Sequence, residues 1–224
     1  MSATYTQNTR TNMLNSQILT GHVLEPRLLG ALMNVAREAF VPESLQGTAY
    51  VDEEIPLGKN RFLMEPLVFA RLLSHAQIQA HETVLDVSVG TGYSSAVLST
   101  LAQKVIAVEE DATLAQKAKS LLAPYSNVAV VQASVAGGVS KESPYDVIII
   151  EGAIEILPQT LTDQLREGGR LLTVEHDADS KIAAAGLGKL VEYKKVRGTL
   201  YKTILRDASV AVLPAFKKSP AFIF

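Results

Sequence analysis

The sequence predicts an α/β fold in which a mainly parallel, doubly wound sheet carries helices on both faces. From residue 84 onward, short apolar runs rich in valine and isoleucine alternate with segments of helical periodicity. Buried parallel strands have this composition, and the helices between them supply the right-handed crossovers that parallel neighbours require. The chain has 224 residues, 47% of them hydrophobic and 20% charged, which is enough for one domain with a large core.

Each strand is predicted from an apolar run and each helix from a stripe of apolar residues. Strands are expected at 84–87, 105–108, 128–131, 146–150 and 170–174. Helices are expected between them at 93–101, 112–122 and 157–165. Three strand-like segments follow at 189–196, 199–207 and 209–214, with a turn at Arg197-Gly198. They predict an antiparallel edge that finishes the sheet, with its paired element near 199–213.

The N-terminal region is predicted to be a helical cap on this sheet. Helices are expected at 12–19, at 25–40 and from Pro66 to about residue 76, and prolines suit the first turn of the last two. Residues 1–11 are interpreted as a loose polar tail and residues 43–65 as mostly loop. We therefore expect one domain spanning 1–224, with a cap and connecting segment at 1–65 and the sheet-bearing core at 66–224.

Composition excludes several classes of protein. The chain has no cysteine, which rules out disulfides, thiolate zinc sites and cysteine nucleophiles. Its four histidines show no metal-ligand spacing, so no metal is expected. A net charge of -2 and a pI of about 6.1 provide no basic field for nucleic acid. No signal peptide is recognised, and no run approaches the roughly 20 apolar residues that cross a bilayer. We expect a cytoplasmic protein.

The stretch VLDVSVGTGYSSAV, which begins at Val84, is typical of a ligand-binding turn between a strand and a helix. In open parallel sheets, ligands bind beyond the carboxyl ends of the strands. Gly90 and Gly92 allow the backbone to approach a ligand closely, and the following helix presents its first amides. Glycines that only form a tight turn are the alternative. Ser88 stands where many such loops have their first glycine, and it is tolerable there if its φ is negative.

Two classes of cofactor use this geometry. Dinucleotide sites favour G-x-G-x-x-G, and Tyr93 at the third glycine position argues against a nicotinamide cofactor. Sites for S-adenosylmethionine typically place an acid at the end of the first strand, which Asp86 supplies, before a G-x-G-x-G loop. Glu109 ends the second strand, where a carboxylate accepts hydrogen bonds from both ribose hydroxyls of an adenosine cofactor. We therefore expect S-adenosyl-L-methionine as the cofactor, bound by Asp86, Ser88, Gly90, Gly92, Tyr93 and Glu109.

The sequence resembles the protein-L-isoaspartate O-methyltransferases over roughly residues 35–175. AREAFVPESLQGTAYVDEEIPLG, which begins at Ala36, is similar to a segment characteristic of that family, and VLDVSVGTGYSSAVLSTLA is similar to its cofactor loop. YDVIIIEGAIEILPQTLTDQLREGGRLL resembles its fourth strand, following helix and fifth strand. The resemblance implies a Rossmann-like S-adenosylmethionine-dependent methyltransferase fold. It also implies methyl transfer to the side-chain carboxylate of isoaspartyl residues in damaged proteins, a repair reaction.

The family's active-site stretch, Thr-Ile-Ser-Gln-Pro, is replaced in this chain. An ungapped alignment ending at Pro66 places Phe62, Leu63, Met64 and Glu65 there, so both hydroxyls are lost. No catalytic residue is therefore assigned from the resemblance.

Further departures from the family pattern fall around the same cleft. Ser88 replaces the first loop glycine, Ser134 stands where the family usually has an acid near the adenine, and Glu151-Gly152 replaces a small neutral pair. We expect Phe62, Met64, Glu151 and Gly152 to line the substrate cleft, with residues 60–65 as its lid or far wall.

Four functions follow from these observations. The first is an isoaspartyl O-methyltransferase of reduced activity, because bulky apolar groups replace two hydroxyls beside the acceptor. The second is a non-catalytic binding or scaffold member of the family, and the third is a methyltransferase with another acceptor. A nicotinamide oxidoreductase comes fourth. The expected partner is a protein or peptide with isoaspartyl residues, not nucleic acid or membrane, and a homo-oligomer is left open.

Overall fold

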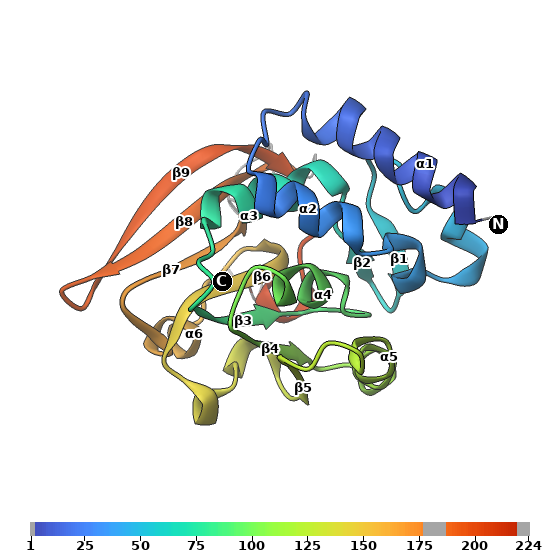
Figure 1. The fold of residues 1–224 in the computed structure, drawn as a ribbon. Helices are drawn as coiled ribbons and strands as arrows, with labels where there is room; N and C mark the ends of the chain where they lie inside the picture. The colour runs from blue at the N-terminus through green and yellow to red at the C-terminus, as the bar shows by residue number, and fades with distance from the viewer. Residues whose placement is uncertain (1–2, 177–186, 219–224) are drawn as a thin grey trace, which may run out of the picture.

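The computed structural model describes residues 3–176 and 187–218, which form one seven-stranded sheet, a separate two-stranded sheet and the helices around them (Figure 1). The order in the large sheet is β5-β4-β3-β6-β7-β8-β9. Strands β3 to β7 are parallel, whereas β8 is antiparallel to both β7 and β9. Because β4 and β6 flank β3 on opposite sides, the chain switches direction there, where open sheets bind ligands.

The five predicted parallel strands, the antiparallel edge and most predicted helices are confirmed. The strands of the large sheet are β3 (Thr83–Val87), β4 (Lys104–Glu109), β5 (Val128–Gln132), β6 (Tyr145–Ile154), β7 (Leu165–Glu175), β8 (Leu187–Val196) and β9 (Thr199–Ser209). The helices are α1 (Ala3–Met13), α2 (Pro26–Asn34), α3 (Pro66–Ala76), α4 (Tyr93–Ser99), α5 (Ala112–Leu122) and α6 (Gln159–Asp163). Local sequence explains several ends. Pro66 starts α3, and the Asp111 carboxylate caps α5 by accepting from the amides of Thr113 and Leu114 at 2.9 Å each.

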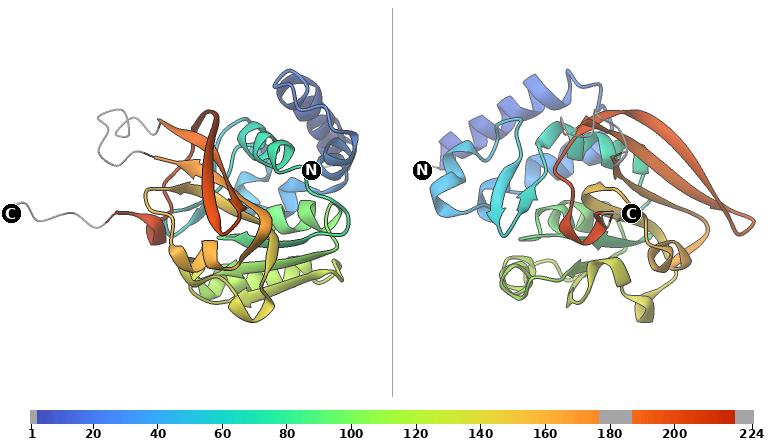
Figure 2. Two further views of the ribbon diagram at one scale, coloured as in Figure 1. Left: turned by 90° about the vertical axis from the view of Figure 1, so that its left-hand side faces the viewer. Right: turned by 180° about the vertical axis from the view of Figure 1, so that it is seen from behind.

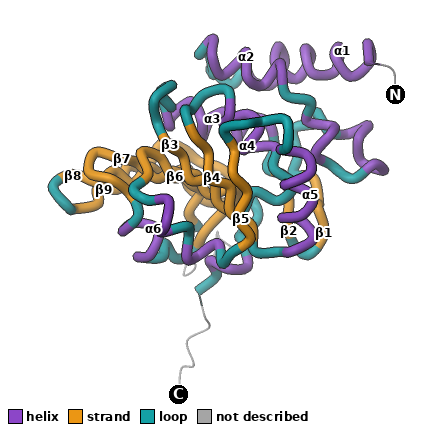
Figure 3. Tube along the Cα trace, turned by 60° about the horizontal axis from the view of Figure 1, so that its bottom comes forward, coloured by secondary structure: helices purple, strands orange, loops and turns teal. Residues whose placement is uncertain are grey.

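The two faces of the sheet bury different clusters. Alternate strand positions point to opposite sides, so Val84 packs with the N-terminal helices and α4, while Leu85 packs with α6 and the short 3₁₀ segments. Figure 2 shows the N-terminal helices gathered on one side of the molecule, and Figure 3 shows the strands as a central layer with helices on either side. The first face is the one that the functional residues share.

The N-terminal region is more ordered than its composition predicts. The expected polar tail is wrong from Ala3 onward, because α1 covers that segment and continues into a π-helical turn at Leu14–Ile18. Arg10 secures α1 by donating to the Tyr50 hydroxyl at 2.8 Å and to the Met33 carbonyl at 2.7 Å. These contacts join residues far apart in the sequence, so the periodicity of the tail gave no sign of them.

Residues 43–65 are mostly irregular, as expected, but they contain a β-hairpin. Strands β1 (Ile55–Gly58) and β2 (Arg61–Leu63) pair antiparallel with each other as the two-stranded sheet. Figure 3 shows this hairpin beside α5, away from the central strands.

The C-terminal edge is antiparallel, as predicted, and its turn lies at Arg197-Gly198, where both residues have positive φ. The segment 209–214 is not a third strand, because its contact with the sheet is a single bridge between Val212 and Ala153. The long β8–β9 hairpin projects from the side of the molecule (Figure 1). Within residues 3–176 and 187–218, no helix has both the length and the apolar character needed to span a bilayer.

Candidate functional site at the ends of three strands

Three acidic side chains share one face of the sheet at the carboxyl ends of adjacent strands. Asp86 in β3 pairs with Ala107 in β4 and with Ile149 in β6. Glu109 and Glu151 each follow those partners by two positions, so they point to the same side as Asp86. Their exposed fractions are 0% for Asp86, 0% for Glu109 and 8% for Glu151. The structure therefore brings together two predicted cofactor residues and one predicted cleft residue.

The loop after β3 has left-handed backbone at three alternate positions. Gly90 has φ 56° and Gly92 has φ 97°, which suits glycine, but Ser88 has φ 67°. Ser88 therefore does not meet the condition of negative φ under which a serine is tolerable at this position. Its amide donates to the Val108 carbonyl at 2.9 Å, which holds the turn against β4. The Ser88 hydroxyl is buried and has no hydrogen-bond partner among the described residues.

Asp86 is held by two serines of α4. The hydroxyls of Ser94 and Ser95 donate to Asp86 Oδ2 at 2.7 and 2.6 Å. Burial raises the pKa of Asp86 to about 7, the hydrogen bonds from Ser95 and Ser94 oppose the shift, and the charge of Glu109 adds to it. Asp86 Oδ1 has no partner in the described part of the chain. The two serines were not singled out from the sequence, although their place in the first turn of α4 was the available signal.

Glu109 connects the glycine loop to the β1–β2 hairpin. Its Oε2 accepts from the Gly90 amide at 2.8 Å. Its Oε1 accepts from the amides of Glu110 and Asp111 at 3.0 Å each and from Arg61 Nη1 at 2.8 Å. Arg61 Nη2 also donates to the Ser88 carbonyl at 2.6 Å. Arg61 is 5% exposed, so this is a buried ion pair directly on the loop.

The β1–β2 hairpin covers the loop at two further points. A Cβ built on Gly90 would lie 2.7 Å from Leu57 Cδ1, so the Leu57 side chain fills the space above that glycine. Lys59, at the hairpin tip, donates to the Asp111 carboxylate at 2.6 Å. Of residues 60–65, which were expected to form the lid or far wall, Arg61 contacts the loop, while Leu57 and Lys59 lie outside that range. Arg61 was not singled out from the sequence.

Glu151 lies beside two buried arginines. Burial raises the pKa of Glu151 well above its ordinary value, and the charge of Asp86 adds to this, while Arg37 and Arg61 oppose it. Arg37 donates to the carbonyls of Ala49 and Met64 at 2.7 and 2.6 Å, and so ties the cap to the start of α3. Burial therefore favours the neutral form of this carboxyl, which can donate a hydrogen bond.

The expected cleft residues line one small hollow beside Glu151. Its walls are Glu54, Asn60, Phe62, Met64, Glu151, Gly152, Ala211, Val212 and Leu213, and it has about 10 Å³ of free volume. That is close to the minimum that one water molecule requires. A wider groove of about 570 Å³ continues outward past Phe62 to His176. Phe62 is 37% exposed and Met64 is 3% exposed, so the two residues that replace the family's hydroxyls differ in accessibility.

Two other predicted cofactor residues make no contact with the three carboxyl groups among the hydrogen bonds of the described residues. The side chain of Tyr93, expected at the cofactor, packs instead against the rings of Phe40 and Phe69, with centroids 5.8 and 5.5 Å away. Ser134 lies at the carboxyl end of β5 and is exposed.

The two remaining residues of the replaced stretch also lie outside the small hollow's lining. Leu63 is buried in the core. Glu65 precedes α3, where burial, with added repulsion from Asp52 and Glu54, raises the pKa of its carboxyl to about 7.

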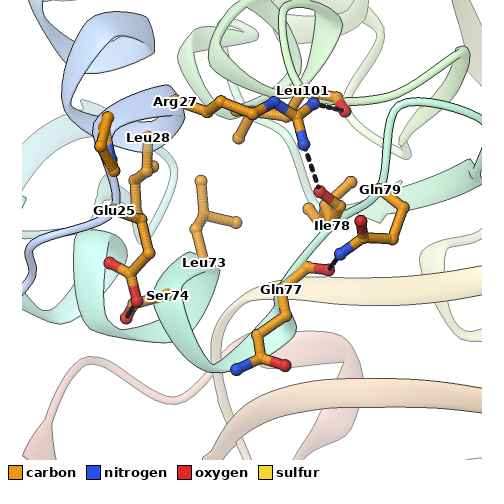
Figure 4. Close-up of a pocket in the computed structure, with 10 residues that line it drawn as sticks. Glu25, Arg27, Leu28, Leu73, Ser74, Gln77, Ile78, Gln79 and Leu101 are labelled. Carbon is orange, nitrogen blue, oxygen red and sulfur yellow. Dashed lines mark hydrogen bonds between the residues drawn. The ribbon is translucent and has the colours of Figure 1, made fainter.

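A second hollow lies between α2 and the end of α3 (Figure 4). It has about 300 Å³ of free volume and is lined by Glu25, Pro26, Arg27, Leu28, Leu73, Ser74, Gln77, Ile78, Gln79 and Leu101. Arg27 is engaged there by the carbonyls of Ile78 and Leu101 at 3.1 and 2.7 Å. None of the site residues predicted from the sequence lines this hollow, so the carboxyl ends of the strands are the candidate site.

Comparison with known proteins gives the same family over most of the chain. The model of the Protein-L-isoaspartate(D-aspartate) O-methyltransferase (PCMT) family matches residues 8–204. A protein-L-isoaspartate O-methyltransferase of Methanoculleus marisnigri is 34% identical over 174 residues, which cover 77% of this chain and 79% of that protein. The enzyme of the same name from Koribacter versatilis is 32% identical over 200 residues, covering 88% of this chain and 87% of the relative.

Solved structures agree on the fold. A protein-L-isoaspartate O-methyltransferase structure superposes with a TM-score of 0.75 at 22% identity, covering 91% of this chain and 65% of that chain. A Plasmodium falciparum structure, described as a beta-aspartate methyltransferase (PCMT) in complex with S-adenosyl-L-homocysteine, has a TM-score of 0.76 at 17% identity and covers 94% of this chain and 98% of that chain. From the family match and the similarity to full-length relatives, the chain belongs to the protein-L-isoaspartate(D-aspartate) O-methyltransferase family.

Proposed function

We propose that this protein transfers a methyl group from S-adenosyl-L-methionine to the side-chain carboxylate of isoaspartyl residues in damaged proteins, at a reduced rate. The observation that carries the proposal is the buried Glu109 carboxylate, which faces the Ser88–Gly92 loop at the switch point of a parallel sheet and accepts from the Gly90 amide. Family membership supplies the reaction class.

The residues present fit an adenosine cofactor. Asp86 Oδ1, Ser88 Oγ and Glu151 Oε1 are buried and lack hydrogen-bond partners within the described ranges. Buried polar atoms rarely stay unpaired, so a polar ligand at the loop accounts for all three. Glu109 would hold the ribose hydroxyls, and Asp86 with the loop backbone would hold the amino-acid part. When bound, the cofactor supplies an electrophilic methyl group on sulfur.

The chain's own residues contribute position and shielding. A carboxylate acceptor is already nucleophilic, so no general base is required, and the reaction depends on alignment and exclusion of water. Met64 and Phe62 border the hollow where the acceptor would sit. Burial favours the neutral form of Glu151, and in that form the side chain would offer one hydrogen bond to an anionic acceptor.

The missing hydroxyls are the reason to expect a low rate. Loss of one preorganised polar contact at a reacting centre commonly costs about 10²–10³ in rate. The test is methyl transfer from S-adenosyl-L-methionine to an isoaspartyl peptide, with the normal aspartyl peptide as control, for the wild type and the double variant Phe62→Thr/Met64→Ser. We expect turnover well below about 1 s⁻¹ for the wild type and a rise in the variant. Wild-type turnover above that value would show that the hydroxyls are dispensable, and no methylation by either protein would refute the proposed reaction.

We further propose that the protein acts in the cytoplasm on protein or peptide substrates and not on nucleic acid. The absence of cysteine and the near-neutral charge support this. The groove of about 570 Å³ outside Phe62 offers room for the residues that flank an isoaspartyl group.

A further inference from the structure

The ion pair between Arg61 and Glu109, the residue proposed to bind the cofactor's ribose, is the least expected feature of the site. Arg61 reaches from β2 to Glu109 Oε1 at 2.8 Å and to the Ser88 carbonyl at 2.6 Å. Both partners of the ion pair are nearly inaccessible, with exposed side-chain fractions of 5% for Arg61 and 0% for Glu109. The contact joins residues 48 positions apart, and it lies where the ribose of the cofactor is proposed to bind.

Most of the hydrogen-bonding capacity of Glu109 is taken. A carboxylate offers about four lone-pair positions, two on each oxygen. Oε1 accepts from the amides of Glu110 and Asp111 and from Arg61 Nη1, whereas Oε2 accepts from the Gly90 amide alone. A ribose diol that hydrogen-bonds to both carboxylate oxygens therefore needs the place that Arg61 occupies on Oε1.

We propose that Arg61 is an internal competitor of the cofactor and sets its affinity. In the structure described here the guanidinium holds Glu109, and the β1–β2 hairpin covers the loop, with Leu57 against Gly90. A nucleoside cofactor binds only after Arg61 leaves Glu109 and the hairpin moves outward. This inference rests on the proposed function, because it assumes that Glu109 receives the ribose.

The tip of the hairpin can move outward while its base stays packed. The two strands hydrogen-bond to each other and form no ladder with the large sheet, and the base residues Ile55 and Leu63 belong to the core. The tip, Gly58 to Asn60, has left-handed backbone throughout, with φ of 94°, 52° and 57°. Lys59 pairs with the Asp111 cap of α5 and is 65% exposed, so its ion pair adds little to holding the tip closed. Release of Arg61 leaves Glu109 with three backbone donors, so the open form carries no unpaired buried charge.

The competition reduces the apparent affinity to the intrinsic affinity multiplied by the fraction of molecules in the open form. The experiment is titration calorimetry with S-adenosylhomocysteine on the wild type, Arg61→Gln and Lys59→Gln. The two variants each remove one positive charge from the same hairpin, and only Arg61→Gln frees Glu109. We expect Arg61→Gln to bind about tenfold or more tightly, equal to about 1.4 kcal/mol, and Lys59→Gln to stay within about twofold of the wild type. Arg61→Lys keeps the charge but cannot make both contacts, so its affinity should lie between those of the wild type and Arg61→Gln. It replaces Arg61→Gln in the experiment if the glutamine variant folds poorly.

A second readout needs no ligand. Hydrogen exchange of the amides in 55–63 should be faster in Arg61→Gln than in Lys59→Gln or the wild type. Equal or weaker binding by Arg61→Gln, or unchanged exchange, would overturn the competition while leaving the cofactor assignment intact. If none of the proteins binds S-adenosylhomocysteine, both the competition and the proposed function are refuted.

Discussion

Replacing Ser88 with glycine should stabilise the protein. Ser88 has φ 67°, and left-handed backbone costs a non-glycine residue about 1–2 kcal/mol. Its hydroxyl is buried and has no partner in the described residues, and a group of this kind costs about 1–3 kcal/mol. Two effects oppose the gain. Glycine adds about 0.5–1 kcal/mol of entropy to the unfolded chain, and one buried carbon worth about 0.8 kcal/mol is lost.

The sum of these contributions raises the free energy of unfolding of Ser88→Gly by about 1 kcal/mol or more. Urea unfolding followed by circular dichroism measures this, and with a slope of about 2 kcal/mol per molar urea the midpoint should rise by about 0.5 M. Ser134→Gly is the matched control, because Ser134 is exposed and has φ -58°. The free energy of unfolding of Ser134→Gly should be about 0.4–1 kcal/mol lower than that of the wild type. A Ser88→Gly variant no more stable than the wild type, or shifted in the same direction as Ser134→Gly, would refute the reasoning from backbone strain.

Three further predictions concern the same site. Burial raises the pKa of Asp86 from 3.8 to about 7, so the folded protein holds a proton that the unfolded chain releases between those values, and stability falls as pH rises through that window. Asp86→Asn should remove that fall, so urea midpoints at pH 5 and pH 8 should differ less in the variant than in the wild type. Burial raises the pKa of Glu151 and favours its neutral form, so Glu151→Gln, which is always neutral, should retain methyl transfer at pH 7, and an inactive Glu151→Gln would show that the carboxylate form is required. Gly92 has φ 97°, and a Cβ there would lie 2.6 Å from Leu122 Cδ1, so Gly92→Ala should destabilise the protein by about 2 kcal/mol or more. Gly30 lies inside α2 with open space around its Cβ, so Gly30→Ala should stabilise the protein by up to about 1 kcal/mol in the same urea unfolding experiment.

The sequence alone was sufficient for the sheet and for the position of the site. Apolar runs separated by helical periodicity are a local signal, because a parallel strand covered on both faces must be apolar along its whole length. The ends of those runs then located Asp86 and Glu109. Alternation along each strand placed them, together with Glu151, on one face. Strand and helix bounds followed closely wherever proline or a capping aspartate marked them, as at Pro66 and Asp111.

Only the tertiary structure decided what those side chains contact. The pairing of Arg61 with Glu109 joins a hairpin to a strand across 48 positions, and no periodicity encodes a contact of that kind. The left-handed φ of Ser88 is imposed by the turn's hydrogen bond to Val108, against the local preference of serine. Tyr93 turned toward Phe40 and Phe69 because burial of an aromatic ring outweighs its place beside the loop. Helix α1 formed where composition suggested a tail, since Arg10 gains partners on Tyr50 and Met33 only once the cap has folded. In each case a long-range contact of a polar or aromatic group outweighed a weak local preference, which is why the sequence determined the framework and the fold determined the chemistry of its cleft.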